Sequence, residues 1–182
     1  MSVQTRTSTR TRIKMCGFTR EADVQAAVQA GADAIGFVLY PPSPRAVSIE
    51  RAAELAALLP AFVTPVLLFV NEAPERVQAA CAAVPGALLQ FHGDETPEYC
   101  TELSRQTGRP HLKAARIPLE AAASFDLLKF AQLHHHAQAI LLDAHVDGFG
   151  GGGKAFNWSL LPPSVNAHLV LSGGLTPANV AD

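Results

Sequence analysis

Short apolar runs recur along this chain, and their starts lie 22 to 29 residues apart. Runs such as "VTPVLLFV" and "AILLDA" are almost continuously apolar, which is typical of strands that are covered on both faces. Seven such runs predict seven strands. They start at Arg12, Ala34, Val63, Ala87, His111, Ala139 and His168.

The stretches between the runs have the period of an amphipathic helix. In "READVQAAVQAGA" the apolar residues Val24, Ala27 and Val28 share one helical face, and "IERAAELAALLP" repeats this spacing. The repeating unit is therefore a strand followed by a helix.

Helix boundaries agree with this unit. Thr96 and Thr176 each precede a proline, as an N-cap does, and Gly31 lies where a helix C-cap belongs. Alternating strands and helices predict an α/β protein with a parallel sheet. Seven units of this length fit a TIM (β/α)8 barrel better than an open doubly wound sheet, although the period alone is compatible with both.

A closed barrel of this type needs eight strands, and the sequence supplies seven. We therefore expect a (β/α)8 barrel that is truncated after strand 7, with the eighth βα unit missing and an open sheet edge. The expected organisation is a disordered N-terminal extension over residues 1–11. One barrel domain, incomplete at its C-terminus, follows over residues 12–182.

The charge balance narrows the class of partner. Lys and Arg number 14 against 16 Asp and Glu, so the net charge of −2 gives no electrostatic reason to expect a nucleic acid or an acidic membrane. No apolar run approaches the roughly 20 residues that cross a bilayer, and no secretory signal is visible. We expect a cytoplasmic monomer or homodimer that acts on a small soluble substrate.

Cysteine and histidine patterns give little reason to expect a metal. Cys16, Cys81 and Cys100 lack the spacing of metal ligands and cannot all pair, which favours free thiols in a reducing compartment. Cys81 and Cys100 fall within helical stretches, where a buried apolar role is the usual one. The adjacent imidazoles of His134 to His136 diverge around a helix axis, so we expect no metal site there.

Two strand ends carry groups suited to proton transfer, because the active sites of TIM barrels lie at the carboxyl ends of the strands. Cys16 is either a small buried apolar group or, as a thiolate, a general base. Asp143 either caps a loop or, desolvated after "AILL", stays protonated as a general acid. On strands one and six, they would face each other across the barrel mouth.

Other polar groups at the mouth suit substrate binding. Arg45 follows the stiff "PPSP" segment and offers a planar fork to a carboxylate, unless it is simply solvated. Gln90 and His92 lie at alternate positions of one strand and point inward, either to position substrate or to bond within the barrel. Gly173 and Gly174 precede a helix start, where backbone amides suit a phosphate.

The segment "DGFGGGGKAFNW" resembles a phosphate-binding P-loop with Ala155 where a magnesium-binding hydroxyl belongs. It follows the strand that ends at Asp143, and no long helix follows it. We interpret it as a mobile flap that closes over a phosphosugar, with Lys154 helping to attract the phosphate.

Seven blocks together identify a family resemblance. In order they are "KMCGFTR", "AGADAIGFVLYPPSPR", "FVN", "QFHGDE", "LLDA", "GFGGGGKAFNW" and "LSGGLTPANV", and they extend from Arg12 to the end of the chain. They resemble the signature blocks of the phosphoribosylanthranilate isomerases of tryptophan biosynthesis.

The resemblance implies a cofactor-free Amadori rearrangement of N-(5-phosphoribosyl)anthranilate to 1-(2-carboxyphenylamino)-1-deoxyribulose 5-phosphate. Asp143 matches the general acid that opens the ribose ring, and Cys16 matches the base that removes the C2 proton. Arg45 matches the residue that meets the anthranilate carboxylate. Gly173 and Gly174 match part of the phosphate site.

The chain departs from the family pattern in three places. Gly152 replaces a threonine, Asn157 replaces an aspartate, and the eighth strand is absent. One alternative is therefore an inactive truncated barrel that binds phosphorylated ligands weakly or self-associates through its open edge. Another phosphate-binding barrel isomerase is a third possibility, which the "KMCGFTR" block disfavours.

Overall fold

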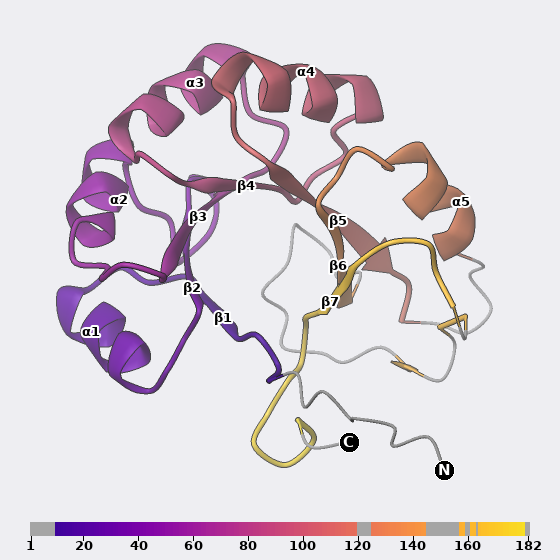
Figure 1. The fold of residues 1–182 in the computed structure, drawn as a ribbon, viewed down its shortest axis with the longest axis horizontal. Coiled ribbons are helices and arrows are strands. Elements are labelled where there is room, and N and C mark those ends of the chain that lie inside the picture. Colours follow the sequence, from indigo (N-terminus) through magenta and orange to yellow (C-terminus); the bar gives the residue numbers. More distant parts are fainter. Residues whose placement is uncertain (1–9, 120–124, 145–156, 159–160, 163, 181–182) are drawn as a thin grey trace, which may run out of the picture.

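The chain forms a curled parallel sheet with helices on its outer face (Figure 1). This computed structural model describes residues 10–119, 125–144, 157–158, 161–162 and 164–180. Within them, seven parallel strands pair in chain order. The strands are β1 (Lys14–Cys16), β2 (Ala34–Val38), β3 (Thr64–Phe69), β4 (Leu88–Phe91), β5 (His111–Ile117), β6 (Ala139–Ala144) and β7 (Leu169–Leu171). Every predicted strand is thus confirmed.

Helices follow the first five strands and cover the sheet from outside (Figure 1). They are α1 (Glu21–Gln29), α2 (Ile49–Ala56), α3 (Pro74–Ala83), α4 (Pro97–Thr107) and α5 (Leu127–Leu133). After α1, Gly31 has a left-handed φ of 90°, and its N–H donates to Val28 O while the N–H of Ala32 donates to Ala27 O. This Schellman motif confirms the predicted C-cap.

Two prolines were expected to open helices. Pro97 does so, and the side chain of Thr96 accepts a hydrogen bond from the N–H of Tyr99 at 3.2 Å, as an N-cap does. After Thr176 the described residues form a turn, in which the N–H of Val180 donates to Thr176 O. A helix beyond that turn would lie outside the described residues.

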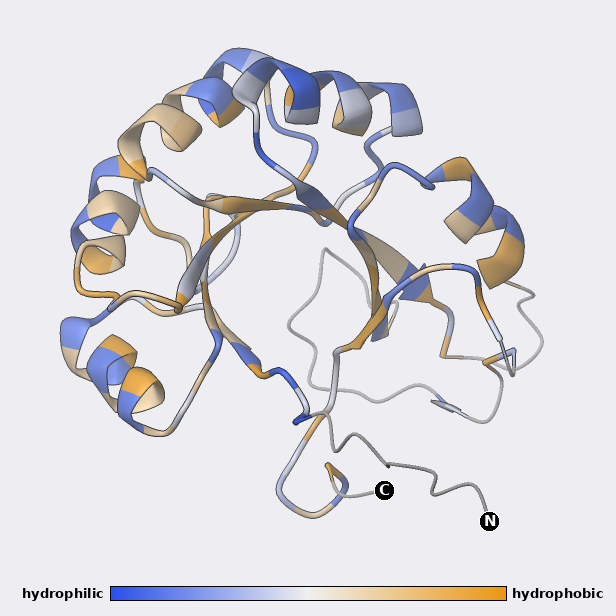
Figure 2. Cartoon of the chain, in the orientation of Figure 1, coloured by the Kyte–Doolittle hydropathy of each residue, from blue (hydrophilic) through white to orange (hydrophobic). Residues whose placement is uncertain are grey.

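The main core lies between the sheet and the helices. Phe37, Phe69 and Phe91 point outward from consecutive strands, are fully buried and pack against helix residues such as Val24 and Leu55. Hydropathy follows the same division, because hydrophobic residues predominate along most of the strands, whereas hydrophobic and hydrophilic residues alternate along the helices (Figure 2). The outer layer thereby holds the strands in place and leaves the inner face for other side chains.

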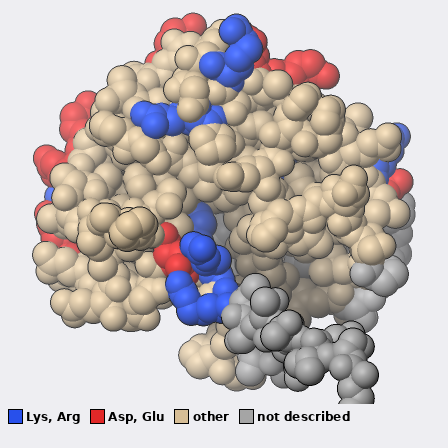
Figure 3. Space-filling model, in the orientation of Figure 1, with Lys and Arg blue, Asp and Glu red and all other residues tan. Residues whose placement is uncertain are grey.

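The inner face combines a small apolar cluster with polar groups. Val38, Leu68 and Val70 pack there against Cys16 and Tyr40. In the view of Figure 3, charged side chains of both signs lie mainly around the rim and beside the grey residues, while most of the surface is uncharged. No helix among the described residues is long and apolar enough to span a membrane.

Among the described residues no strand pairing joins β7 to β1, so the ring of strands stays open there. The coarse prediction of a parallel barrel-type sheet is confirmed. Most of the predicted extension over residues 1–11 lies outside the described residues, so the predicted domain boundaries stay a prediction.

Candidate active site

The polar side chains singled out in the sequence gather at the carboxyl ends of the strands. Cys16 ends β1, Asp143 lies near the end of β6, and His92 directly follows β4. Because the sheet is parallel and curled, these ends surround one mouth (Figure 1). The fold therefore brings residues from distant parts of the sequence to one edge.

Cys16 has room on the inner face because its neighbour in the sheet is a glycine. Gly36 stands in register with Cys16, and a Cβ atom at Gly36 would lie 2.4 Å from the Cys16 Sγ. The same point lies 3.1 Å from the Nζ of Lys14, so the thiol and this ammonium are neighbours. Sequence reasoning assigned Lys14 no role. The space that it shares with Cys16 comes from Gly36 on the neighbouring strand, and the pattern of a single strand does not reveal such a space.

The other two cysteines have different surroundings. Burial raises the pKa of the Cys100 thiol to about 12, and burial also raises that of Cys81. Both side chains are packed within the helical layer and remain protonated at neutral pH. The expectation that they are apolar packing groups is confirmed.

Arg45 is held beside the end of β1. Its Nη1 donates to the carbonyl oxygen of Cys16 at 3.0 Å, and Ser43 Oγ accepts from its backbone N–H at 3.2 Å. These bonds fix the loop after β2 against the strand that carries the thiol. The guanidinium therefore stands at the mouth, next to Cys16.

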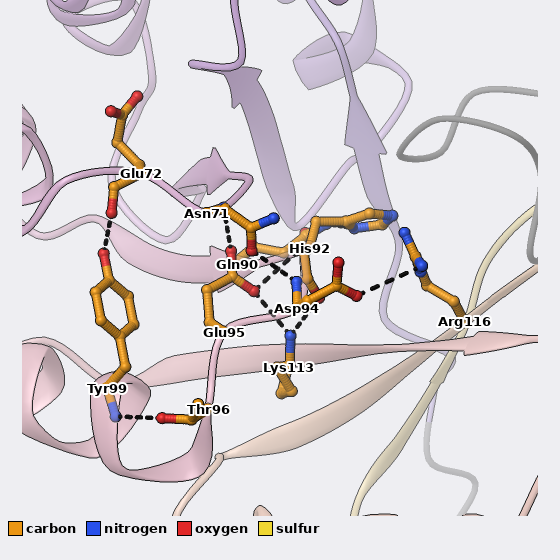
Figure 4. Close-up of polar contacts among 11 residues, drawn as sticks. Asn71, Glu72, Gln90, His92, Asp94, Glu95, Thr96, Tyr99, Lys113 and Arg116 are labelled. Carbon is orange, nitrogen blue, oxygen red and sulfur yellow. Dashed lines mark hydrogen bonds and ion pairs between the residues drawn. The ribbon is translucent and has the colours of Figure 1, made fainter.

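Asp143 lies in a buried chain of three polar side chains. His92 Nε2 is 3.0 Å from Asp143 Oδ2. Gln90 Nε2 is 2.9 Å from His92 Nδ1, and Figure 4 labels these two residues. All three residues are at most 7% exposed. The N–H of His92 also donates to Phe69 O at 2.9 Å, which fixes the residue to the neighbouring strand. The prediction that Gln90 and His92 point inward is confirmed.

A second polar cluster supports the loops after β3 and β4. Glu95 accepts from the backbone N–H groups of Asn71 and Gly93, at 2.8 and 2.9 Å, and from Lys113 Nζ at 2.8 Å (Figure 4). The side chains of Glu95 and Lys113 are each 2% exposed. Sequence reasoning missed this pair. The available signal was a lysine within the otherwise apolar segment "HLKAARI", since a buried lysine requires a partner.

Charged groups also line the rim above this cluster. Arg116, in register with Asp143 on the neighbouring strand, has its Nη2 3.4 Å from Asp94 Oδ1. The backbone N–H of Asp94 donates to Asn71 Oδ1 at 2.7 Å. Arg116 is thus a cationic group near Asp143 that the sequence analysis did not select.

The predicted phosphate-binding residues follow β7. Gly173 and Gly174 have φ angles of 77° and 65°, and Asn179 Nδ2 donates to the carbonyl oxygen of Gly174 at 3.0 Å. The backbone N–H of the preceding Ser172 donates to Leu142 O at 2.8 Å, so these glycines follow β7 beside the end of β6. Lys154 and the rest of the glycine-rich segment over residues 145–156 lie outside the described residues, so the flap cannot be placed.

The histidine triplet has divergent surroundings. His134 ends α5 and packs on Phe130 with ring centroids 4.6 Å apart, whereas His135 lies against His136. Within the part of the chain that the structure describes, no cluster of three potential metal ligands occurs. The mouth can instead supply a thiol, a carboxyl group, an imidazole and two guanidinium groups, a set suited to proton transfer and anion binding.

Comparison with protein families identifies relatives over nearly the whole chain. Residues 13–182 match the family model described as N-(5′-phosphoribosyl)anthranilate isomerase. A relative from Methylibium petroleiphilum with that name is 62% identical over 173 residues, covering 95% of this chain and 78% of the relative.

Solved structures give the same result. The crystal structure of phosphoribosyl anthranilate isomerase from Thermotoga maritima is 38% identical, has a TM-score of 0.80, and aligns over 94% of this chain and 80% of that one. A structure of monomers generated from the dimeric Thermotoga maritima enzyme has a TM-score of 0.77 at 35% identity, over 94% and 80% of the two chains.

Proposed function

Because this chain belongs to the N-(5′-phosphoribosyl)anthranilate isomerase family, we propose that Asp143 and Cys16 are the general acid and general base of its reaction. Family membership makes the chain an isomerase of tryptophan biosynthesis. The reaction expected for it converts N-(5′-phosphoribosyl)anthranilate to 1-(2-carboxyphenylamino)-1-deoxyribulose 5-phosphate, in the cytoplasm and without a cofactor. The observation that carries the proposal is the placement of both groups at one mouth.

The first step opens the ribose ring. Asp143 gives its carboxyl proton to the ring oxygen, the bond between C1 and that oxygen breaks, and the nitrogen lone pair forms a C1=N double bond. Asp143 is buried, so its carboxyl group would meet the ring oxygen away from bulk water. The products of this step are a carboxylate and a protonated Schiff base.

The second step removes the proton from C2. The Cys16 thiolate takes this proton, and the C–H electron pair forms a C1=C2 bond that neutralises the nitrogen. The enolamine then tautomerises to the ketone. One proton leaves the acid and one reaches the base, so exchange with solvent restores both groups. The ammonium group of Lys14 lies beside this thiol on the inner face of the sheet.

Substrate anions have candidate partners around these groups. Arg45, fixed at the end of β1, is proposed to bind the anthranilate carboxylate. Gly173 and Gly174 are proposed to bind the phosphate through backbone amides. Gln90 and His92 are proposed to shape the interior beside Asp143.

Steady-state kinetics tests the two catalytic roles. We expect Cys16→Ala and Asp143→Asn each to lower kcat by about 100-fold or more, the usual contribution of acid–base catalysis, with unchanged circular dichroism. Loss of substrate fluorescence measures turnover. Cys81→Ala, in α3, and Asp23→Asn, on the exposed face of α1, are the matched controls. Full activity of Cys16→Ala or Asp143→Asn would remove that residue from the mechanism.

The open ring supports a further proposal, that an eighth βα unit completes the barrel and the phosphate site. The chain can be extended with the last unit of the Methylibium petroleiphilum relative and assayed alongside the original chain. We expect the extension to lower the KM. An unextended chain that binds phosphate but shows no turnover would instead favour the inactive truncated barrel.

Association between two copies has a specific candidate surface. Phe62 is 99% exposed and has a φ of 73°, an unfavourable angle for an aromatic residue. It borders a hollow of about 510 Å³ lined by apolar residues that include Leu59, Val63, Val84 and Pro85. We propose a homodimer in which Phe62 of each copy enters the hollow of the other, since a two-fold interface uses one patch twice. The Thermotoga maritima relative, which is described as dimeric, supports the association of two copies.

Sedimentation velocity tests the dimer. We expect Phe62→Glu to dissociate it, because a carboxylate cannot enter an apolar hollow without a large desolvation cost. Leu128→Glu, on the exposed face of α5, is the matched control and leaves the dimer intact. Association that persists in Phe62→Glu would point to the open sheet edge instead.

A further inference from the structure

Both side-chain oxygens of Asp143 have hydrogen-bond partners in this structure. Oδ1 accepts from the backbone N–H of Ala144 at 3.0 Å, and Oδ2 lies 3.0 Å from His92 Nε2. An ionised carboxylate accepts at both oxygens, and it is the state that the proposed acid reaches after it has given its proton to substrate. The surroundings of Asp143 therefore suit the product of proton transfer.

The partner of the other ring nitrogen identifies which nitrogen of His92 carries hydrogen. Gln90 Nε2 lies 2.9 Å from His92 Nδ1, and a carboxamide nitrogen can only donate. Nδ1 must therefore accept, so a neutral imidazole carries its hydrogen on Nε2. That hydrogen is the one directed at Asp143. The carboxamide thus makes His92 a hydrogen-bond donor to the carboxylate.

This arrangement leaves one polar atom of Gln90 unsatisfied. Its Oε1 is buried and has no hydrogen-bond partner among the described residues, which is an unfavourable state for a buried acceptor. Rotating the carboxamide would require hydrogen on His92 Nδ1, and a neutral ring would then direct a lone pair at Asp143. The unsatisfied oxygen indicates that donation to Nδ1 has a function at this site.

We propose that His92 is a positioning residue whose Nε2–H stabilises the Asp143 carboxylate as it forms, and that Gln90 fixes this tautomer. The inference rests on the proposed role of Asp143 as the acid. When Asp143 transfers its own proton to the ribose ring oxygen, the hydrogen on His92 Nε2 stays in place and its bond to Oδ2 strengthens. Stabilisation of a charge that develops during the reaction lowers the barrier.

Charged groups from neighbouring strands face the same site. Arg116 of β5 is in register with Asp143, and Asp94 lies 3.4 Å from Arg116. Cys16 and Lys14 belong to β1, and Lys113 is neutralised by Glu95. Asp94 and Glu95 thus partner the two cationic groups of β5 at this edge of the sheet.

Nitrogen-15 NMR of histidine-labelled protein without substrate tests the tautomer directly. The chain has seven histidines, and the signals lost in His92→Gln assign those of His92. We expect the neutral ring to carry its hydrogen on Nε2 and none on Nδ1, which the two nitrogen shifts report separately. A signal showing hydrogen on Nδ1, or on both nitrogens, would overturn the proposal.

Kinetics tests the contribution of His92 to the reaction. We expect His92→Met to lower kcat about tenfold or more and to move the basic limb of the kcat profile to higher pH, because a carboxyl without a donor keeps its proton longer. His92→Gln, whose amide can still donate, should restore part of the loss. Equal losses in both variants with an unmoved pH profile would leave His92 only a packing role.

A substitution at Gln90 separates tautomer control from substrate binding. Gln90→Met should lower kcat with KM changed less than about twofold, whereas a variant that only raises KM would make Gln90 a substrate contact and overturn its assigned role. Gln78→Met, which removes an exposed bond to Gln106, is the matched control. The NMR result needs no turnover, so failure of the tautomer assignment can be distinguished from failure of the proposed function.

Discussion

At the scale of single residues, the candidate site depends on small side chains that leave room for reactive ones. Gly36 shows this best, because Cys16 Sγ and Lys14 Nζ occupy the space where its side chain would lie. A thiol and an ammonium can therefore be neighbours on the inner face of the barrel. A larger residue at Gly36 would displace both.

We expect Gly36→Ala to lower kcat about tenfold or more, since a Cβ 2.4 Å from Sγ must push the thiol aside. Overpacking should also reduce the free energy of unfolding by about 1–3 kcal/mol. Gly108→Ala is the control. Gly108 has a positive φ of 63°, so alanine should destabilise the protein there, but its side chain would enter open space and displace no other residue. A normal kcat in Gly36→Ala would show that the Cys16 thiol can reach its working position without the space beside Gly36.

The buried pair of Lys113 and Glu95 gives a second prediction at this scale. Lys113→Met leaves the carboxylate of Glu95 buried without its cation, which should cost about 3–5 kcal/mol in urea unfolding. Adding Glu95→Gln should recover part of that loss. Arg105→Met, which breaks the exposed pair with Glu102, should cost far less, because solvent screens that pair. If breaking the buried pair and breaking the exposed pair lowered the free energy of unfolding equally, burial would not explain the contribution of Lys113.

At the scale of elements, the ends of the helices control how the loops at the mouth begin and end. Helix α4 starts with Thr96 as N-cap and Pro97 in its first turn, just after the segment that carries His92 and Glu95. Its buried residues Cys100 and Leu103 fix it against the sheet. The cap therefore links a local sequence signal to the position of the site loop.

Removing the cap should destabilise the protein modestly. Thr96→Ala leaves the N–H of Tyr99 without its acceptor and should lower the free energy of unfolding by about 1 kcal/mol. Thr96→Ser retains a hydroxyl and should remain close to the original stability. Thermal unfolding of the two variants checks this, and an equal loss in both would mean that the threonine methyl group matters instead.

At the scale of the whole molecule, two buried histidines connect stability to pH. Burial lowers the pKa of His111 from 6.5 to about 4, with a smaller contribution from His136. Burial likewise lowers the pKa of His134 to about 4, and the positive charge of Lys113 makes a smaller contribution in the same direction. Both rings have an Nδ1 without a partner among the described residues, so both are neutral in the fold.

We therefore expect stability to fall on acidification. Below about pH 6.5 the unfolded chain binds protons at these histidines while the folded chain does not, so stability is lost until about pH 4, where the folded state is protonated as well. The loss is roughly 3 kcal/mol for each residue at most. His111→Phe should reduce the slope of unfolding free energy against pH, measured in urea, whereas an unchanged slope would exclude His111.

Much of this organisation could be predicted from the sequence. The alternation of apolar runs and amphipathic stretches identified every strand of the described sheet and the first two helices, because burial on one or both faces leaves a periodic trace. Strand ends then directed attention to Cys16 and Asp143, since active sites of parallel barrels lie there. The blocks from "KMCGFTR" to "LSGGLTPANV" determined the family.

Only the tertiary structure decided which side chains meet. Gln90 and Asp143 belong to different strands, and their connection through His92 depends on the curvature and register of the sheet. The partnership of Glu95 with Lys113 likewise joins different parts of the chain. Local periodicity records whether a residue is buried, whereas hydrogen bonds and ion pairs between strands depend on distances that no local pattern contains. The sequence by itself determined the elements and the family, and the packing of the elements decided how the acid is held.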